Sequence, residues 1–204
     1  DACGLSVTNN SDVVLQATGE SCNAAFIRKV SGETGGIIII SGSKLKAESS
    51  FPGLFSTGHM TIDGGEVKAV SAEDAAIWAV GNLTVKGGAK LKLDGAYPSG
   101  CPDGSLFTVE AADIDAKNSN TENIPALFNN PEISRGYQLS FAKAVDSEGT
   151  EIDLLSSGTQ FFNLYKNVHF VTQEAVTTIE MPFVKTVKQG GSVAPGKQTF
   201  EFEI

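Results

Sequence analysis

Hydrophobic and polar residues alternate in short runs through the middle of the chain, and the runs recur at a nearly constant interval. Gly58, Gly81 and Gly104 are spaced 23 residues apart, and each lies between two apolar segments. The segments before the first two glycines correspond, since residues 54–57 read Leu-Phe-Ser-Thr and residues 77–80 read Ile-Trp-Ala-Val. Self-similarity with a period of roughly 20–50 residues is typical of repeat architectures. The chain from Gly36 to Lys117 is therefore predicted to be an array of repeats.

Each repeat contains two short alternating strands joined by a glycine corner, followed by a third segment after a variable loop. Alternation with a period of two residues indicates that one face of each strand is buried. The corners contain Gly42, Gly64, Gly65, Gly87 and Gly88, which can adopt the backbone angles of a sharp turn. Because no two-residue Asn-Gly turn joins the strands, each unit should pair with the next copy rather than with itself.

Stacked copies place equivalent apolar residues above one another, about 4.8 Å apart. We predict three internal columns: Ile40, Ile62, Val85 and Val109; Ile38, Met60, Leu83 and Phe107; Leu45, Val67, Leu91 and Ile114. A buried aliphatic side chain contributes roughly 1.5–3 kcal/mol, so the columns offset the entropy of ordering only together. The predicted fold is all-β, a right-handed parallel β-helix with irregular capping segments at both ends.

The open edges of such a coil need protection, and four segments are expected on this basis. Residues 1–35 would form an N-terminal cap and a degenerate first rung, with residues 20–30 as a short helix or irregular plug. Residues 36–117 would form the regular rungs, and residues 118–180 an insertion and closing rungs. Residues 181–204 would form a C-terminal hairpin or the start of a further module.

Charge and hydropathy exclude several classes of function. Asp and Glu outnumber Lys and Arg by 24 to 15, and the net charge of −9 repels polyphosphate, so nucleic acid is not an expected partner. No run of about 18 apolar residues exists, so no membrane insertion is expected. The chain opens at Asp1 without a basic or apolar leader, which is typical of a processed, exported product.

Three cysteines, Cys3, Cys22 and Cys101, leave one unpaired under any single disulfide. Cys3 and Cys22 are slightly less than one repeat apart, so a bond between neighbouring coils is one possibility. The alternative is that all three thiols are small buried hydrophobes.

The repeat resembles a known kind of surface protein. Residues 60–69, Met-Thr-Ile-Asp-Gly-Gly-Glu-Val-Lys-Ala, resemble the β-helix repeats of surface and adhesin proteins from Gram-positive, often gut-dwelling, bacteria. They also look like the β-helical carbohydrate-binding domains of cellulolytic clostridia. The resemblance covers residues 36–117 and implies an extracellular location at the cell surface or cell wall. It further implies a non-catalytic adhesin, stalk or glycan-binding surface, whose partner would be an extracellular polysaccharide or a host or cell-wall glycan.

The C-terminal tail carries a second resemblance. Residues 181–204 look like the first two strands of a streptococcal pilin-type isopeptide domain, in which a lysine bonds to a later asparagine with the help of an acid. Lys185 matches that lysine. The partner asparagine and acid are missing here, so the bond is not expected to form in this chain. The alternative is an ordinary hairpin that caps the coil.

Lys46, Lys68 and Lys92 should stack on the outside of one column of strands. Stacked like charges reduce stability, most strongly at low salt. The functional interpretation is a groove for an acidic polysaccharide or cell-wall polymer. The structural interpretation is a solvated lysine face that keeps the sheet from aggregating.

Phe55 and Trp78 occupy equivalent positions in neighbouring repeats and should lie one above the other. With Phe51 they could form a platform on which sugar rings stack. Aromatic stacks inside a coil or at its corners are the alternative.

Metal and catalytic sites have weaker support. Asp63, Asp94, Asp103, Asp113 and Asp115 are candidates for Ca²⁺, which needs six to eight convergent oxygens, but no Asp-x-Asp-x-Asp-Gly loop is present. No cofactor is therefore expected, with Ca²⁺ as the alternative.

An enzyme is not expected either, because the only arginines, Arg28 and Arg135, lie outside the clear rungs and no paired aspartates lie on adjacent strands. His59 and His169 lack a nucleophile context. The alternative is a β-helical polysaccharide lyase or glycoside hydrolase acting on acidic polysaccharide, an argument from fold analogy.

Overall fold

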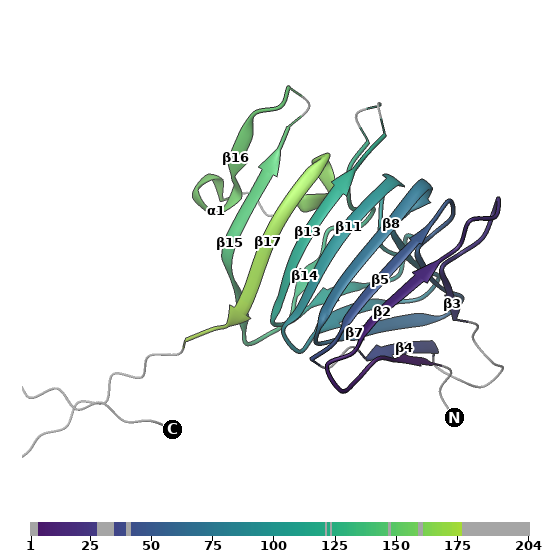
Figure 1. The fold of residues 1–204 in the computed structure, drawn as a ribbon. Helices are drawn as coiled ribbons and strands as arrows, with labels where there is room; N and C mark the ends of the chain where they lie inside the picture. Colours follow the sequence, from purple (N-terminus) through teal and green to yellow (C-terminus); the bar gives the residue numbers. More distant parts are fainter. Residues whose placement is uncertain are drawn as a thin grey trace, which may run out of the picture.

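The computed structural model describes residues 4–27, 35–39, 42–120, 122, 124–146, 148–158 and 161–176. These residues wind into a parallel β-solenoid of about four turns, built from three sheets (Figure 1). The predicted parallel β-helix is confirmed.

The first sheet, sheet A, has six strands, and every neighbouring pair is parallel. Its order is β1 (Gly4–Ser6), β4 (Gly35–Ile39), β7 (His59–Asp63), β10 (Leu83–Lys86), β12 (Phe107–Val109) and β14 (Glu132–Ile133). Each strand comes from one coil further along the chain, as a solenoid requires.

Sheet B is the broad sheet that faces the viewer in Figure 1, and sheet C is a narrow third wall. In sheet B the order is β16 (Glu151–Asp153), β15 (Tyr137–Val145), β17 (Asn167–Glu174), β13 (Ala112–Asn118), β11 (Ala89–Tyr97), β8 (Glu66–Ala75), β5 (Lys44–Ser49) and β2 (Asp12–Gln16). In sheet C the order is β3 (Ala25–Ile27), β6 (Leu54–Ser56) and β9 (Ile77–Ala79).

The corners between sheets A and B are the predicted glycine turns. Gly64 and Gly65 have φ angles of 71° and 69°, and Gly87 and Gly88 have φ angles of 67° and 75°. This left-handed region is costly for residues with a Cβ atom. The glycine pairs therefore let the chain turn sharply between β7 and β8, and again between β10 and β11.

The predicted columns are confirmed within sheet B. Leu45, Val67, Leu91 and Ile114 share one register position and are at most 2% exposed. In sheet A, Ile62 lies beside Val85, and Val85 lies beside Val109, also as predicted. These side chains fill the space between the sheets and form one continuous core.

The predicted alignment of the first coil in sheet A is wrong by two residues. Ile38, and not Ile40, pairs with Ile62, so Gly36 pairs with Met60. Residues 37–40 are all isoleucine, and a slip of two residues keeps every side chain on the same face, so alternation cannot detect it. Lys44 still pairs with Glu66, so the first coil spans two more residues between these positions than the second.

The N-terminal segment is more regular than the predicted cap. Residues 4–27 contribute one strand to each sheet, and each of these strands is parallel to its neighbour in the next coil. The expected helix or irregular plug at residues 20–30 is corrected, because Ala25–Ile27 form strand β3 beside β6. Residues 28–34 lie outside the described part of the chain.

Within the predicted insertion and closing rungs, β14 pairs parallel with β12 and continues the solenoid, but the strands after it are not closing rungs. β17 pairs with β13, β15 with β17, and β16 with β15, all antiparallel. Antiparallel neighbours can be joined by short connections, whereas a further parallel rung needs a complete coil. The three strands extend sheet B past the last coil and cover the edge of β13, visible at the left of Figure 1.

Two short helices complete this end. Helix α1 (Leu154–Ser157) begins after Asp153, whose side chain accepts hydrogen bonds from the backbone of Leu155 and Ser156. The 3₁₀ helix η1 (Phe162–Leu164) buries Phe162, whose ring lies 4.4 Å from that of Phe170 between centroids. No helix of the described chain has the length and apolar character needed to cross a bilayer.

Residues 177–204 lie outside the described residues, and so does Lys185 with the hairpin or further module predicted there. Cys22 is an exposed free thiol and Cys101 a buried one, and the possible Cys3–Cys22 bond involves a residue outside the described part of the chain. Cys3 itself lies outside the described residues.

Candidate functional site

The outer face of sheet B carries polar side chains in rows that cross the strands. Parallel pairing without a shift places one residue of each coil at the same position, about 4.8 Å from the next. The first of these rows alternates in sign: Asp12, Lys44, Glu66, Lys90 and Asp113. Opposite charges on neighbouring strands stabilise a sheet, so this row is electrostatically self-consistent.

The second row does not alternate. Lys46, Lys68 and Lys92 occupy consecutive positions on β5, β8 and β11, as predicted, and we call them the lysine row. Val14 precedes the lysine row on β2, and Asp115 follows it on β13. Three like charges therefore stand side by side on the middle strands of the sheet.

Ion pairs are formed by Lys44 beside the lysine row and by Lys46 within it, but the other two lysines of the row have none with the residues described. Lys44 lies 3.5 Å from Glu66, and Lys46 lies 2.7 Å from Glu48 on its own strand. Lys68 and Lys92 are exposed and form no ion pair with any described residue. Two of the three cations therefore have no ion-pair partner in the described part of the chain, although Asp115 is the register neighbour of Lys92.

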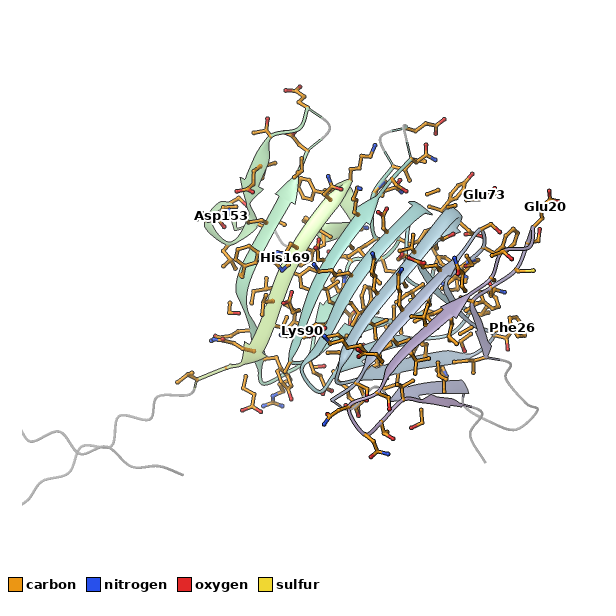
Figure 2. The ribbon with its side chains drawn as sticks, in the orientation of Figure 1. Glu20, Phe26, Glu73, Lys90, Asp153 and His169 are labelled. Atoms are coloured by element: carbon orange, nitrogen blue, oxygen red, sulfur yellow. The ribbon has the colours of Figure 1, made fainter. Side chains whose placement is uncertain are left out.

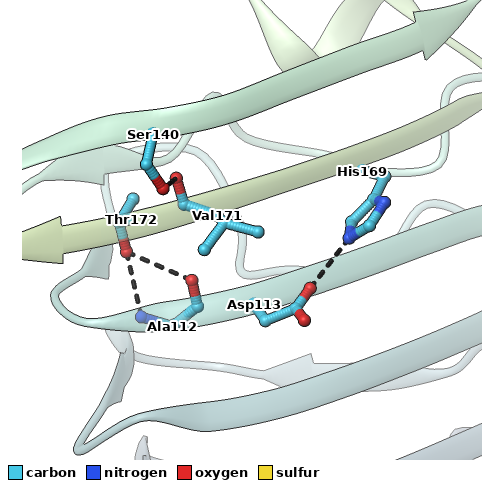
Figure 3. Close-up of polar contacts among 6 residues, drawn as sticks. All are labelled: Ala112, Asp113, Ser140, His169, Val171 and Thr172. Carbon is cyan, nitrogen blue, oxygen red and sulfur yellow. Dashed lines mark hydrogen bonds and ion pairs between the residues drawn. The ribbon is translucent and has the colours of Figure 1, made fainter.

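A histidine and a carboxylate meet beyond the end of the lysine row. Nε2 of His169 on β17 lies 2.8 Å from Oδ1 of Asp113 on β13 (Figure 3), and both side chains are about two-fifths exposed. The His169 ring also packs against Phe141, with 4.8 Å between centroids. Lys143 is opposite His169 on β15, and a hydrogen bond to Glu151 raises the pKa of Lys143.

No local pattern indicated this contact, because it depends on antiparallel pairing between strands 56 residues apart in sequence. On β17 the buried Thr172 reinforces that pairing. Its hydroxyl accepts a hydrogen bond from the backbone N–H of Ala112 at 3.0 Å (Figure 3).

These rows border an open hollow of about 700 Å³ on sheet B. The charged groups that line it are five lysines, four carboxylates and His169: Asp12, Lys44, Lys46, Glu66, Lys68, Lys90, Lys92, Asp113, Asp115 and His169. Lys90 and His169 are seen on this face in Figure 2. Five lysines against four carboxylates give the lining a small positive charge, and three of those lysines are the consecutive members of the lysine row.

The two aromatic candidates lie elsewhere, on sheet C. Phe55 and Trp78 do occupy paired positions on β6 and β9, as predicted. The Phe55 ring, however, stacks on Phe26 at 5.4 Å with an interplanar angle of 10°, so one of its faces is already covered. Phe26 itself is 55% exposed and projects from the N-terminal end of the solenoid (Figure 2).

Trp78 contacts the ring of Phe128, which is not its register partner in the next coil. Its register partner in the next coil is Gly100, which has no side chain, and Phe128 packs edge-on against Trp78 at 5.4 Å. The four rings therefore form two contacting pairs along sheet C, Phe26 with Phe55 and Trp78 with Phe128. The structure does not bring Phe55 and Trp78 together with the lysine row.

The aspartates proposed for calcium do not converge. Asp63 pairs with Lys86 at 3.6 Å and Asp94 pairs with Lys117 at 3.5 Å. Within the ranges that the structure describes, no three His, Cys, Asp or Glu side chains are grouped in a way that could hold a metal ion.

Fold and site together define a β-solenoid with a cationic row on its broadest face. Comparisons with family models, curated proteins and solved structures gave no match to this chain. The case for a function therefore depends on the geometry of sheet B.

Proposed function

We propose that this chain is the β-solenoid module of a modular bacterial surface protein and that the outer face of sheet B binds an acidic polysaccharide or another anionic wall polymer without turnover. The observation that carries the proposal is the lysine row, in which Lys68 and Lys92 have no ion-pair partner among the described residues, beside a row that alternates in sign. The row from Asp12 to Asp113 follows the rule that opposite charges on neighbouring strands stabilise a sheet. The adjacent lysine row breaks that rule. Departures of this kind are expected at functional positions.

Repulsion within the lysine row destabilises the free protein, and a bound anion would relieve it. Two unit charges about 5 Å apart repel by about 1 kcal/mol in a water-like dielectric, so Lys68 is unfavourably placed between Lys46 and Lys92. An anionic ligand over the row replaces this repulsion with attraction. Relief of the repulsion between the lysines then adds to the free energy of ligand binding.

The net charge of −9 limits how such a ligand is attracted. At long range the protein repels anions, so steering by the overall field does not assist association. Binding would depend on short-range contacts with Lys68 and Lys92. This favours a specific site over the non-specific polyanion binding of strongly basic proteins.

The location and the role as adhesin or stalk are supported by the resemblance of residues 36–117 to surface-protein repeats, and by the shape of the fold. A solenoid is extended and rigid because each coil contacts only its neighbours. Such a scaffold holds a binding face away from its point of attachment.

Binding can be tested on an array of neutral and acidic glycans, followed by titration of the acidic glycans that are retained. Lys68→Ala combined with Lys92→Ala should abolish retention of acidic glycans, while Trp78→Ala on sheet C should leave it unchanged. Retention that survives the double substitution, or that is lost with Trp78→Ala in a folded protein, contradicts the assignment to sheet B. Calcium should be varied, because it can bridge two anionic surfaces.

The second candidate function is a polysaccharide lyase or hydrolase, and the contact between His169 and Asp113 favours it. A carboxylate that orients a histidine is a common arrangement for a general base. Incubation with polyuronates, followed by assays for unsaturated products and new reducing ends, tests this candidate. Products that disappear in His169→Ala would support catalysis, and retention without products supports the binding module.

A further inference from the structure

Resting on the proposed function, we infer that the lysine row recognises a polyuronate that carries one carboxylate on every sugar, and that it engages three consecutive sugars. The ligand runs along the solenoid axis, across β5, β8 and β11. The inference depends on the spacing of the row, on its two ends, and on the charges that flank it.

The spacing of the cations follows from the hydrogen bonds of the sheet. Lys46, Lys68 and Lys92 are register partners on adjacent parallel strands, so their Cα atoms are separated by steps of about 4.8 Å. This step is comparable with the advance of one pyranose ring along a 1,4-linked chain. Lysine has a long, flexible stem, so the ammonium group on each strand could reach the carboxylate of one sugar even where successive sugars are rotated about the chain axis.

The row is closed at both ends. On β2 the equivalent position is Val14, which offers no charge, and on β13 it is Asp115, which repels a carboxylate. Asp113, held by His169, adds a second carboxylate at the same end. An anionic chain along the row therefore meets three lysines. Beyond them it meets a valine at one end and a carboxylate at the other.

The flanking rows confine the ligand laterally. On one side Glu66 lies between Lys44 and Lys90, and on the other side Glu48 and Asp94 present carboxylates. A polyanion displaced to either side would lose the run of three cations and would meet at least one of these carboxylates. Confinement of this kind gives specificity through the repulsion of wrong positions.

The three lysines should contribute unequally. Lys46 already pairs with Glu48 at 2.7 Å, so a ligand has to compete with that carboxylate. Lys68 and Lys92 have no such competitor among the described residues, and Lys68 is in the centre of the row. Lys68 is therefore the residue whose loss should weaken binding most.

Calorimetric titration of the intact chain with galacturonate oligomers, from monomer to hexamer, tests the inference. The affinity should rise with each sugar up to the trimer and then change by no more than about twofold, the scale of statistical and end effects. Lys68→Gln should weaken trimer binding about tenfold, which corresponds to about 1.4 kcal/mol. Lys86→Gln is the matched control, because it makes the same change in charge at an ion-paired position on sheet A, outside the hollow, and it should change the affinity less than about twofold.

Several outcomes would overturn the inference while leaving the proposed function intact. These are an affinity that keeps rising to the hexamer, equal losses in Lys68→Gln and Lys86→Gln, or equal affinity for oligomers that carry a carboxylate only on every second sugar. Tighter binding of glycerol-phosphate oligomers than of the galacturonate trimer would also overturn it. If no anionic oligomer or polymer binds at all, the proposed function itself fails.

Discussion

Lys68 on β8 is directly opposite Lys92 on β11, and neither has an ion-pair partner among the described residues. Removing one of these charges should therefore stabilise the free protein. We expect Lys68→Gln to raise the free energy of unfolding by about half a kcal/mol at low salt, within the range measured for cross-strand pairs. The gain should shrink at high salt, where the repulsion is screened.

Urea unfolding of Lys68→Gln at low and high ionic strength provides the measurement. Lys44→Gln serves as the control, because Lys44 is 3.5 Å from Glu66 and its loss removes an attraction rather than a repulsion. A stability change of the same sign in both variants would show that the lysine row carries no repulsion.

Ile62 is fully buried, and its register partners are Ile38 in the preceding coil and Val85 in the following one. Ile62→Ala should lower the free energy of unfolding by about 2–5 kcal/mol, because it removes apolar contacts and leaves a cavity. Ile62→Val removes a single methylene and should cost about 0.5–1.5 kcal/mol. Chemical denaturation of both variants tests the expected order, with Val14→Ala, at a site 63% exposed, as the surface reference.

Gly87 and Gly88 both have positive φ, but their surroundings differ. A Cβ atom on Gly87 would run into the side chain of Asp63, whereas one on Gly88 would meet nothing within 4 Å. Gly88→Ala should cost about 1–2 kcal/mol for the left-handed backbone alone. Gly87→Ala should cost more, because Asp63 must also move away from Lys86. Equal losses in thermal unfolding would contradict the close approach of this corner to the preceding coil.

Cys22 and Cys101 should differ in reactivity. Burial raises the pKa of the Cys101 thiol, so less of the reactive thiolate is present at a given pH. In the native protein we expect a maleimide to label Cys22 quickly and Cys101 only after unfolding, as peptide mapping by mass spectrometry can show. Because the folded state favours the neutral thiol, its contribution to stability is present below the pKa of an unfolded cysteine and declines as pH rises above that value. Rapid native labelling of Cys101 would contradict its burial.

Repetition made much of the solenoid predictable. The Leu45, Val67, Leu91 and Ile114 column and the lysine row were both found by aligning copies, and both have the expected register. In a solenoid the neighbours of a residue are its equivalents one coil away, so contacts can be inferred from the period. The predicted register was wrong at Ile38. Four consecutive isoleucines allow two alignments that differ by two residues and bury the same face of the strand.

The amino-acid sequence alone determined the repeat, the glycine corners and the charges that the broad face displays, because each is written into every copy of the unit. Only the tertiary structure decided that β17 adds antiparallel to β13, which brings His169 to Asp113, and that Phe128 reaches Trp78 beside Gly100. These contacts join segments without repeat equivalents. Their pairing depends on which strand edges and surfaces are still free once the coils have stacked, and that is a property of the assembled fold rather than of any local pattern.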